Sequence, residues 1–133
     1  MENTARQSNP VGWFEIYVDD LARAKTFYQA VFQRPLENLP MESDKDMEMQ
    51  MCTFAMTADG TGASGALVKS PHMGPGTGGT LIYFTCADCA DEASRVADHG
   101  GTVLQRKKSI GPYGFIAMVR DTEGNTLGLH SIK

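Results

Sequence analysis

Residues 11–18 alternate between two sets of side chains with the two-residue period of a β-strand. One face of this predicted strand is apolar, and the other carries Trp13, Glu15 and Tyr17. The Asp19-Asp20 pair that follows predicts a helix N-cap. Apolar residues then recur at three- and four-residue spacing, which predicts an amphipathic helix that ends before Pro35: Leu21, Ala24, Phe27, Tyr28, Val31 and Phe32.

The middle of the chain contains two predicted short strands and a glycine-rich segment. Methionines alternate with other residues between Asp46 and Met56, the period of a half-buried strand, and residues 65–69 predict another short strand. We expect the methionine face, which includes Met47, Met49 and Met51, to pack in a core or dimer contact; a pliable wall for a ligand is the alternative. Half of the 14 glycines lie between Gly60 and Gly79, which predicts a hinge at residues 71–79.

The order of elements then repeats. A strand at 80–86 is followed by a helix capped by Asp88 and by strands near 102–109, 113–120 and 126–132. Asp88 lies 68 residues after Asp20, so the simplest interpretation is a duplicated βαβββ module. We predict an α+β fold with a flexible leader at 1–10 and a single domain at 11–132, comprising module one at about 11–70 and module two at about 80–132.

Length, net charge and the distribution of apolar residues limit the kinds of partner that we expect for this protein. A chain of 133 residues is one domain by length, and its net charge of −4 argues against nucleic acid as a partner. Its apolar runs are shorter than the roughly 20 residues that span a bilayer, and its first residues lack the apolar stretch of a signal peptide. We therefore expect a cytoplasmic protein that uses neither nucleic acid nor a membrane as a partner.

Several segments resemble the vicinal oxygen chelate superfamily, the group of glyoxalases, extradiol dioxygenases and bleomycin resistance proteins. These segments are residues 14–21 leading to Phe27-Tyr28, residues 109–115, and Arg120-Asp-Thr-Glu-Gly-Asn125 with the strand after it. The resemblance covers residues 11–132 and is nearest to a poorly characterised glyoxalase-like branch. It implies two tandem βαβββ modules whose mixed sheet curves into a cup.

In the metal-dependent members, side chains on the inward faces of the two modules hold a divalent ion. The resemblance places these ligand positions at Trp13, Ala66, Leu81 and Gly128. Indole, aliphatic and glycine residues do not coordinate such ions through side chains. We therefore predict that the family's metal site is absent and that no cofactor is required.

Two residues are candidates for catalysis. Glu15 shares a strand face with two aromatic residues, and a desolvated carboxylate there would serve as a general base. The alternative is a structural carboxylate bonded to a neighbouring strand or paired with a cation. His130 falls on the same strand face as Gly128 and would complement Glu15, whereas the alternative is an exposed histidine at the strand end.

Other residues are assigned to substrate binding or to packing. Trp13, Tyr17 and Tyr113 are expected to line the cup, and Arg106 would meet an anionic substrate unless it is a solvated edge charge. Cys86-Ala-Asp-Cys89 matches a C-x-x-C pattern. An odd number of cysteines, three, in a chain without an export signal favours reduced thiols that pack in the core.

Two functions remain open. The first is a glyoxalase-like enzyme, of lyase or isomerase type, that acts on a small oxygenated metabolite with Glu15 as base. The second is a small-molecule binding protein that sequesters its ligand, as bleomycin-binding members do. In both cases we expect a homodimer with a small-molecule ligand.

Overall fold

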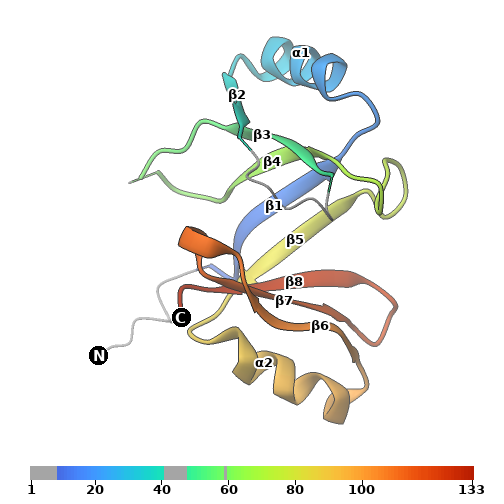
Figure 1. The fold of residues 1–133 in the computed structure, drawn as a ribbon. Coiled ribbons are helices and arrows are strands. Elements are labelled where there is room, and N and C mark those ends of the chain that lie inside the picture. The colour runs from blue at the N-terminus through green and yellow to red at the C-terminus, as the bar shows by residue number, and fades with distance from the viewer. Residues whose placement is uncertain (1–8, 41–47, 59) are drawn as a thin grey trace. The chain divides into compact units, whose positions relative to one another are not determined.

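The computed structural model describes residues 9–40, 48–58 and 60–133. These residues form two α-helices and eight strands, the α+β composition that the sequence predicts. The chain divides into two compact units, one formed by Trp13–Thr80 and the other by Leu81–Lys133 with the chain before Trp13. Each unit contains one helix and a set of four strands (Figure 1).

The first unit contains β1 (Val11–Tyr17) from Trp13 onward and α1 (Leu21–Phe32). The N-cap is Asp20, as predicted, because its carboxylate accepts a 3.0 Å hydrogen bond from the backbone N–H of Arg23. Three strands follow, and the four lie in the order β2-β3-β4-β1: β2 (Leu36–Leu39), β3 (Gln50–Phe54) and β4 (Ser64–Lys69). The pair of β1 and β4 is parallel, whereas the other two pairs are antiparallel, so the set is mixed.

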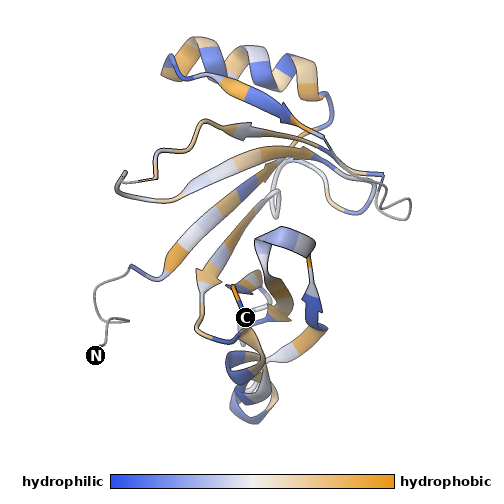
Figure 2. Cartoon of the chain, turned by 60° about the vertical axis from the view of Figure 1, so that its left-hand side comes forward, coloured by the Kyte–Doolittle hydropathy of each residue, from blue (hydrophilic) through white to orange (hydrophobic). Residues whose placement is uncertain are grey.

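One face of the first unit's strands packs against α1. The buried residues there are Leu36, Cys52 and Leu67, and Tyr28 of α1 lies against them. Figure 2 shows hydrophobic and hydrophilic residues intermixed along α1. The predicted apolar face of this helix is packed only in part, because Phe27, Val31 and Phe32 are exposed. The opposite face of the same strands carries Glu15 and Ala66, which are direct neighbours in the register of β1 and β4.

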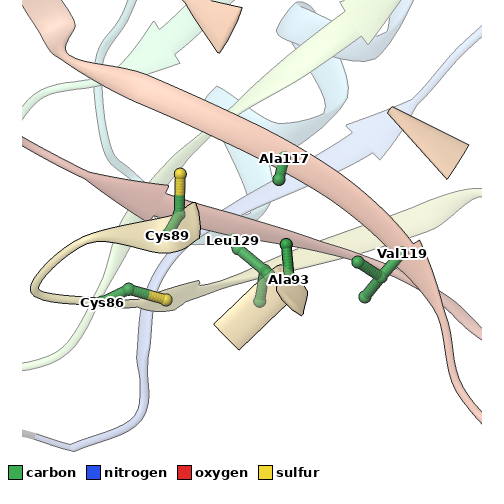
Figure 3. Packing of buried hydrophobic residues seen from close by; sticks show 6 residues of the cluster. All are labelled: Cys86, Cys89, Ala93, Ala117, Val119 and Leu129. Carbon is green, nitrogen blue, oxygen red and sulfur yellow. The ribbon is translucent and has the colours of Figure 1, made fainter. Parts of the chain in front are cut away.

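The second unit contains β5 (Thr80–Thr85) from Leu81 onward and α2 (Cys89–Val96), followed by a 3-10 turn at Ala97–His99. Its remaining strands are β6 (Thr102–Ser109), β7 (Phe115–Arg120) and β8 (Thr126–Ser131), in the order β5-β8-β7-β6. A core of six residues lies between α2 and the strands (Figure 3): Cys86, Cys89, Ala93, Ala117, Val119 and Leu129. The packing prediction for Cys86 and Cys89 is confirmed, because both are buried and unpaired.

Three local predictions differ from the structure. Residues 36–39 form β2, although the sequence pattern predicts no strand there. The strand predicted between Asp46 and Met56 is shorter, at Gln50–Phe54, and Met47 lies outside the described residues. Cys52, and not the methionine face, lies in the core beside α1. Tyr113 does not open β7 but ends a 3-10 turn at Gly111–Tyr113, because Pro112 fixes the first helical positions and Gly111 has a φ of 76°.

Candidate functional site

The side chains of Trp13, Glu15 and Tyr17 lie together on the face of β1 that points away from α1. The Tyr17 hydroxyl donates a 2.5 Å hydrogen bond to Oε1 of Glu15, and the Trp13 indole N–H donates a 3.2 Å bond to Oε2. The two-residue period of the strand places these three residues in a row, so each donor reaches the carboxylate from one side. Both oxygens of Glu15 therefore have a neutral partner from its own strand.

Glu15 is buried, with 7% of its surface exposed. Burial raises the pKa of its carboxyl group, and the hydrogen bonds from Tyr17 and Trp13 lower that pKa by a smaller amount. The described residues place no lysine or arginine in an ion pair with it. Glu15 is thus a desolvated carboxylate held by neutral donors, the environment that strengthens a carboxylate as a base.

The register of the strands shows what surrounds Glu15 in the first unit. Ala66 of β4 is its direct neighbour and is fully buried, and Thr53 of β3 is the next residue in the same row. Tyr17 is registered with Val68, which is also fully buried. The carboxylate therefore lies beside small and apolar side chains, which is consistent with its desolvation.

His130 lies in the second unit, on β8. Its Nε2 is 2.6 Å from the backbone carbonyl oxygen of Tyr113. Since a carbonyl oxygen only accepts, Nε2 is the donor in this contact, and Nδ1 is the ring nitrogen that the contact leaves unused. His130 is half-buried, and its contact with Tyr113 is open to solvent, so the alternative of an exposed histidine at the strand end stays open. Its contact holds the 3-10 turn at Gly111–Tyr113 against β8.

The other predicted binding residues are more exposed. Tyr113 is 60% exposed, and Arg106 is an exposed residue of β6. The neighbouring Lys107 points toward α2, where its ammonium lies 2.8 Å from Asp88 and 4.6 Å from the centre of the Phe115 ring. Arg106 and Tyr113 belong to the second unit together with His130, whereas Glu15, Trp13 and Tyr17 belong to the first.

The four positions at which the resemblance implies metal ligands do not fit a divalent ion. The indole N–H of Trp13 is used as a donor to Glu15, and Ala66 and Leu81 are buried aliphatic residues. A side chain at Gly128 would collide with the Tyr83 ring. Within the described residues, no three His, Cys, Asp or Glu side chains gather closely enough to hold an ion.

The C-x-x-C cysteines do not have the properties of a reactive pair. Burial, with a further contribution from the charge of Glu92, raises the pKa of the Cys86 thiol to about 12. Its Sγ lies 3.6 Å from the carbonyl oxygen of Phe84, as expected for a thiol that donates weakly to the backbone. Cys89 is fully buried. A thiolate at Cys86 is therefore disfavoured.

Sequence reasoning missed two features. A pocket of about 440 Å³ at one end of β3 and β4 contains none of the predicted site residues; it is lined by Glu48, Met49, Gln50, Lys69, Ser70 and Pro71. The second feature is Tyr83, whose ring lies over Gly128. The apolar alternation of β5 identified a strand, but the register that brings these two residues together depends on the pairing of β5 with β8.

Neither helix of the described chain has the length and hydrophobicity of a membrane-spanning segment.

The comparisons with known proteins agree on the fold. A methylmalonyl-CoA epimerase from Streptomyces coelicolor, in complex with 2-nitronate-propionyl-CoA, is 20% identical with a TM-score of 0.62, and the match covers 92% of this chain and 94% of that one. The epimerase from Mycobacterium tuberculosis is 14% identical with a TM-score of 0.67, over 98% and 96% of the two chains. A hypothetical protein from Bacillus halodurans C-125 is 14% identical with a TM-score of 0.69, over 95% and 96%.

Sequence comparison gives the family. No curated protein matches this chain. The family model described as the Glyoxalase/Bleomycin resistance protein/Dioxygenase superfamily matches residues 11–129. Because this match spans most of the chain and both units have the expected order of elements, the chain belongs to the glyoxalase/bleomycin resistance protein/dioxygenase superfamily.

Proposed function

We propose that this chain is an enzyme that acts on a small oxygenated metabolite, with Glu15 as the group that takes a proton from a carbon next to a carbonyl. The observation that carries the proposal is the environment of Glu15. Its carboxylate is buried, is held by Tyr17 and Trp13, and has no cation paired with it among the described residues. Such a carboxylate is a stronger base than one in water, because burial disfavours its charged form.

The two hydrogen bonds give Glu15 a defined orientation. Oε1 accepts the shorter bond, from Tyr17, and Oε2 accepts the longer one, from Trp13. The weaker partner leaves Oε2 as the more available acceptor, so we assign the transferred proton to Oε2. Tyr17 then continues to donate to Oε1 and keeps the carboxyl group in place. Trp13, which is half-buried, also provides an aromatic surface on which a substrate would rest, with the buried Tyr17 beneath it on the same strand face.

His130 is proposed as an acid–base group of the second unit. Its Nε2 is committed to the carbonyl oxygen of Tyr113, so Nδ1 is the ring atom that would exchange a proton with a substrate. Tyr113 and Arg106 are proposed to contact the substrate, Arg106 by attracting an anionic group. No step of this proposal uses a metal ion, because the four implied ligand positions do not fit one.

The structural neighbours guide the choice of substrates to test. Two of them are named as methylmalonyl-CoA epimerases, one with a bound 2-nitronate-propionyl-CoA. Acyl-CoA thioesters therefore join 2-oxo acids and α-hydroxyketones in the test panel. All three classes carry a C–H bond beside a carbonyl group, which is the bond that a carboxylate base would attack.

Sequestration of a ligand without turnover is the competing function. Two steps distinguish sequestration from catalysis. Native mass spectrometry first identifies a molecule that co-purifies with the protein, and that molecule is then incubated with the wild type and with Glu15→Gln. We expect the wild type to convert it and Glu15→Gln to bind it without conversion. Binding without conversion by both forms would favour sequestration, and undiminished conversion by Glu15→Gln would remove Glu15 as the base.

A matched control separates loss of the base from loss of charge. Glu37 lies on β2, in the same strand row as Glu15, but is exposed. Glu37→Gln removes the same charge from the same unit and is expected to leave conversion unchanged. Equal losses in the two variants would contradict a specific role for Glu15.

The chain is also proposed to be a cytoplasmic homodimer. Its three cysteines are unpaired, as suits a reducing compartment. Exposed apolar residues on α1, including Phe27 and Val31, support an association between chains. Light scattering should then give twice the 14.4 kDa of one chain. A mass of 14.4 kDa at micromolar concentration would contradict the dimer.

A further inference from the structure

Gly128 lies in the interior of β8, where a glycine weakens a strand unless something requires it. Its φ angle is not in the left-handed region, so the backbone there accepts any residue. What an added Cβ would meet is the Tyr83 ring, at Cδ2 and Cε2. The glycine is therefore explained by the ring that lies across it and not by the backbone.

The register places this contact on the face of the second unit away from α2. Tyr83 of β5 is the direct neighbour of Gly128, and Leu129, the next residue of β8, points to the opposite face and into the core beneath α2. Leu81 lies two residues before Tyr83 on β5, hence on the same face, and is 2% exposed. Leu81, Tyr83 and Gly128 thus lie together on one face of this unit.

We propose that Tyr83 occupies the space from which a carboxylate at position 128 would reach an ion, and so determines that this unit does not hold a metal. The lack of a ligating side chain at positions 81 and 128 is then only part of the difference from the metal-dependent members that the resemblance implies. The ring also fills the volume into which a restored side chain would extend. This inference concerns the second unit and is independent of the role proposed for Glu15.

The first test is a double-mutant cycle on thermal stability with Gly128→Ala, Tyr83→Ala and the double variant. Gly128→Ala forces the added methyl against the ring, so we expect its melting temperature to fall by about 5–10 °C, the range for an overpacked core. In the Tyr83→Ala background the same change should have little effect. An equal loss in both backgrounds would overturn the proposal.

A control and a fallback keep the cycle interpretable. A methyl group added at Gly74 would meet no atom within 4 Å, and Gly74 has no positive φ, so Gly74→Ala is expected to leave the melting temperature nearly unchanged. If Gly128→Ala does not fold, folding of the double variant supports the proposal. Failure of the double variant to fold while Tyr83→Ala folds contradicts it.

The second test measures metal binding directly. Leu81→His with Gly128→Glu supplies an imidazole and a carboxylate on one face, and NiCl₂ is titrated into the chelator-treated protein by calorimetry. With Tyr83 retained we expect no binding above that of the wild type. Adding Tyr83→Ala should increase the affinity for Ni²⁺ by about tenfold or more, the lower end of the effect of residues around a metal site. Equal affinity of the two variants, including no binding by either, would overturn the proposal.

Discussion

The hydroxyl of Tyr17 donates a 2.5 Å hydrogen bond to Oε1 of Glu15, two residues earlier on the same strand. This contact is buried, and it opposes the desolvation that raises the Glu15 pKa. Tyr17 therefore has two effects on Glu15: it fixes the orientation of the carboxylate, and it limits how far the pKa rises. Both effects can be measured without knowledge of the substrate.

Tyr17→Phe should raise the pKa of Glu15 further above its ordinary value of 4.5. A donor to the charged form lowers the pKa of a carboxyl group, so removal of the donor has the opposite sign. The carboxyl carbon of Glu15 is followed by ¹³C NMR against pH and assigned by its absence in Glu15→Gln. Trp13→Phe should raise the pKa by a smaller amount, because its hydrogen bond is the weaker contribution. An unchanged or lower pKa in Tyr17→Phe would contradict the geometry.

Glu15→Gln should change how stability depends on pH. The folded-state pKa of Glu15 is raised, so the folded state binds more protons than the unfolded state between the two pKa values. Protonated Glu15 makes its whole contribution to the free energy of unfolding at pH values below its pKa in the unfolded state. That contribution is lost as the pH rises through its pKa in the folded state. The wild type should therefore lose stability relative to Glu15→Gln over that interval, as measured by urea unfolding at several pH values. A constant difference between the two proteins would refute the raised pKa.

The buried thiols should be slow to react with an aromatic disulfide reagent such as DTNB. With a pKa of about 12, the Cys86 thiol has a thiolate fraction of about one part in ten thousand at pH 8. Cys52 and Cys89 are fully buried. We expect the native chain to release little coloured product and the chain in guanidinium chloride to release three equivalents rapidly, one for each cysteine. Rapid reaction of one or two thiols in the native chain would indicate a reactive pair.

Metal content tests the ligand assignment. The side chains of Trp13, Ala66, Leu81 and Gly128 provide no imidazole, carboxylate or thiolate to an ion. Protein purified without a chelator should therefore contain well below one equivalent of nickel, zinc, manganese or iron by plasma mass spectrometry. A stoichiometric ion that survives dialysis would show that other residues hold it.

Much of the fold could be predicted from local sequence patterns. Asp20 and Asp88 cap their helices as expected, and the alternation in residues 11–17 placed Glu15 beside two aromatic residues. β2 was not predicted because Leu36–Leu39 is too short to show an alternating pattern and is flanked by two prolines. The helix-side position of Cys52 was missed because Met51 and Cys52 are both apolar, so periodicity alone does not decide which of them faces α1.

The candidate site was predictable only in part. Alternation gave the shared face of Trp13, Glu15 and Tyr17, but their hydrogen bonds depend on side-chain rotamers, which a pattern does not determine. The contact of Tyr83 with Gly128 requires the parallel register of β5 and β8, two strands with 40 residues of sequence between them. The turn that His130 holds through Tyr113 likewise depends on tertiary structure.

The most direct test of the proposed function is deuterium exchange in D₂O, followed by ¹H NMR, at carbons next to the carbonyl groups of 2-oxo acids, α-hydroxyketones and acyl-CoA thioesters. We predict that wild-type protein accelerates exchange in at least one compound and that Glu37→Gln does the same. Glu15→Gln should slow this exchange by about 10²–10⁴-fold, the contribution of a positioned general base. Exchange that is as fast in Glu15→Gln as in the wild type, or binding of these compounds to the wild type with no exchange in any of them, would contradict Glu15 as the proton acceptor.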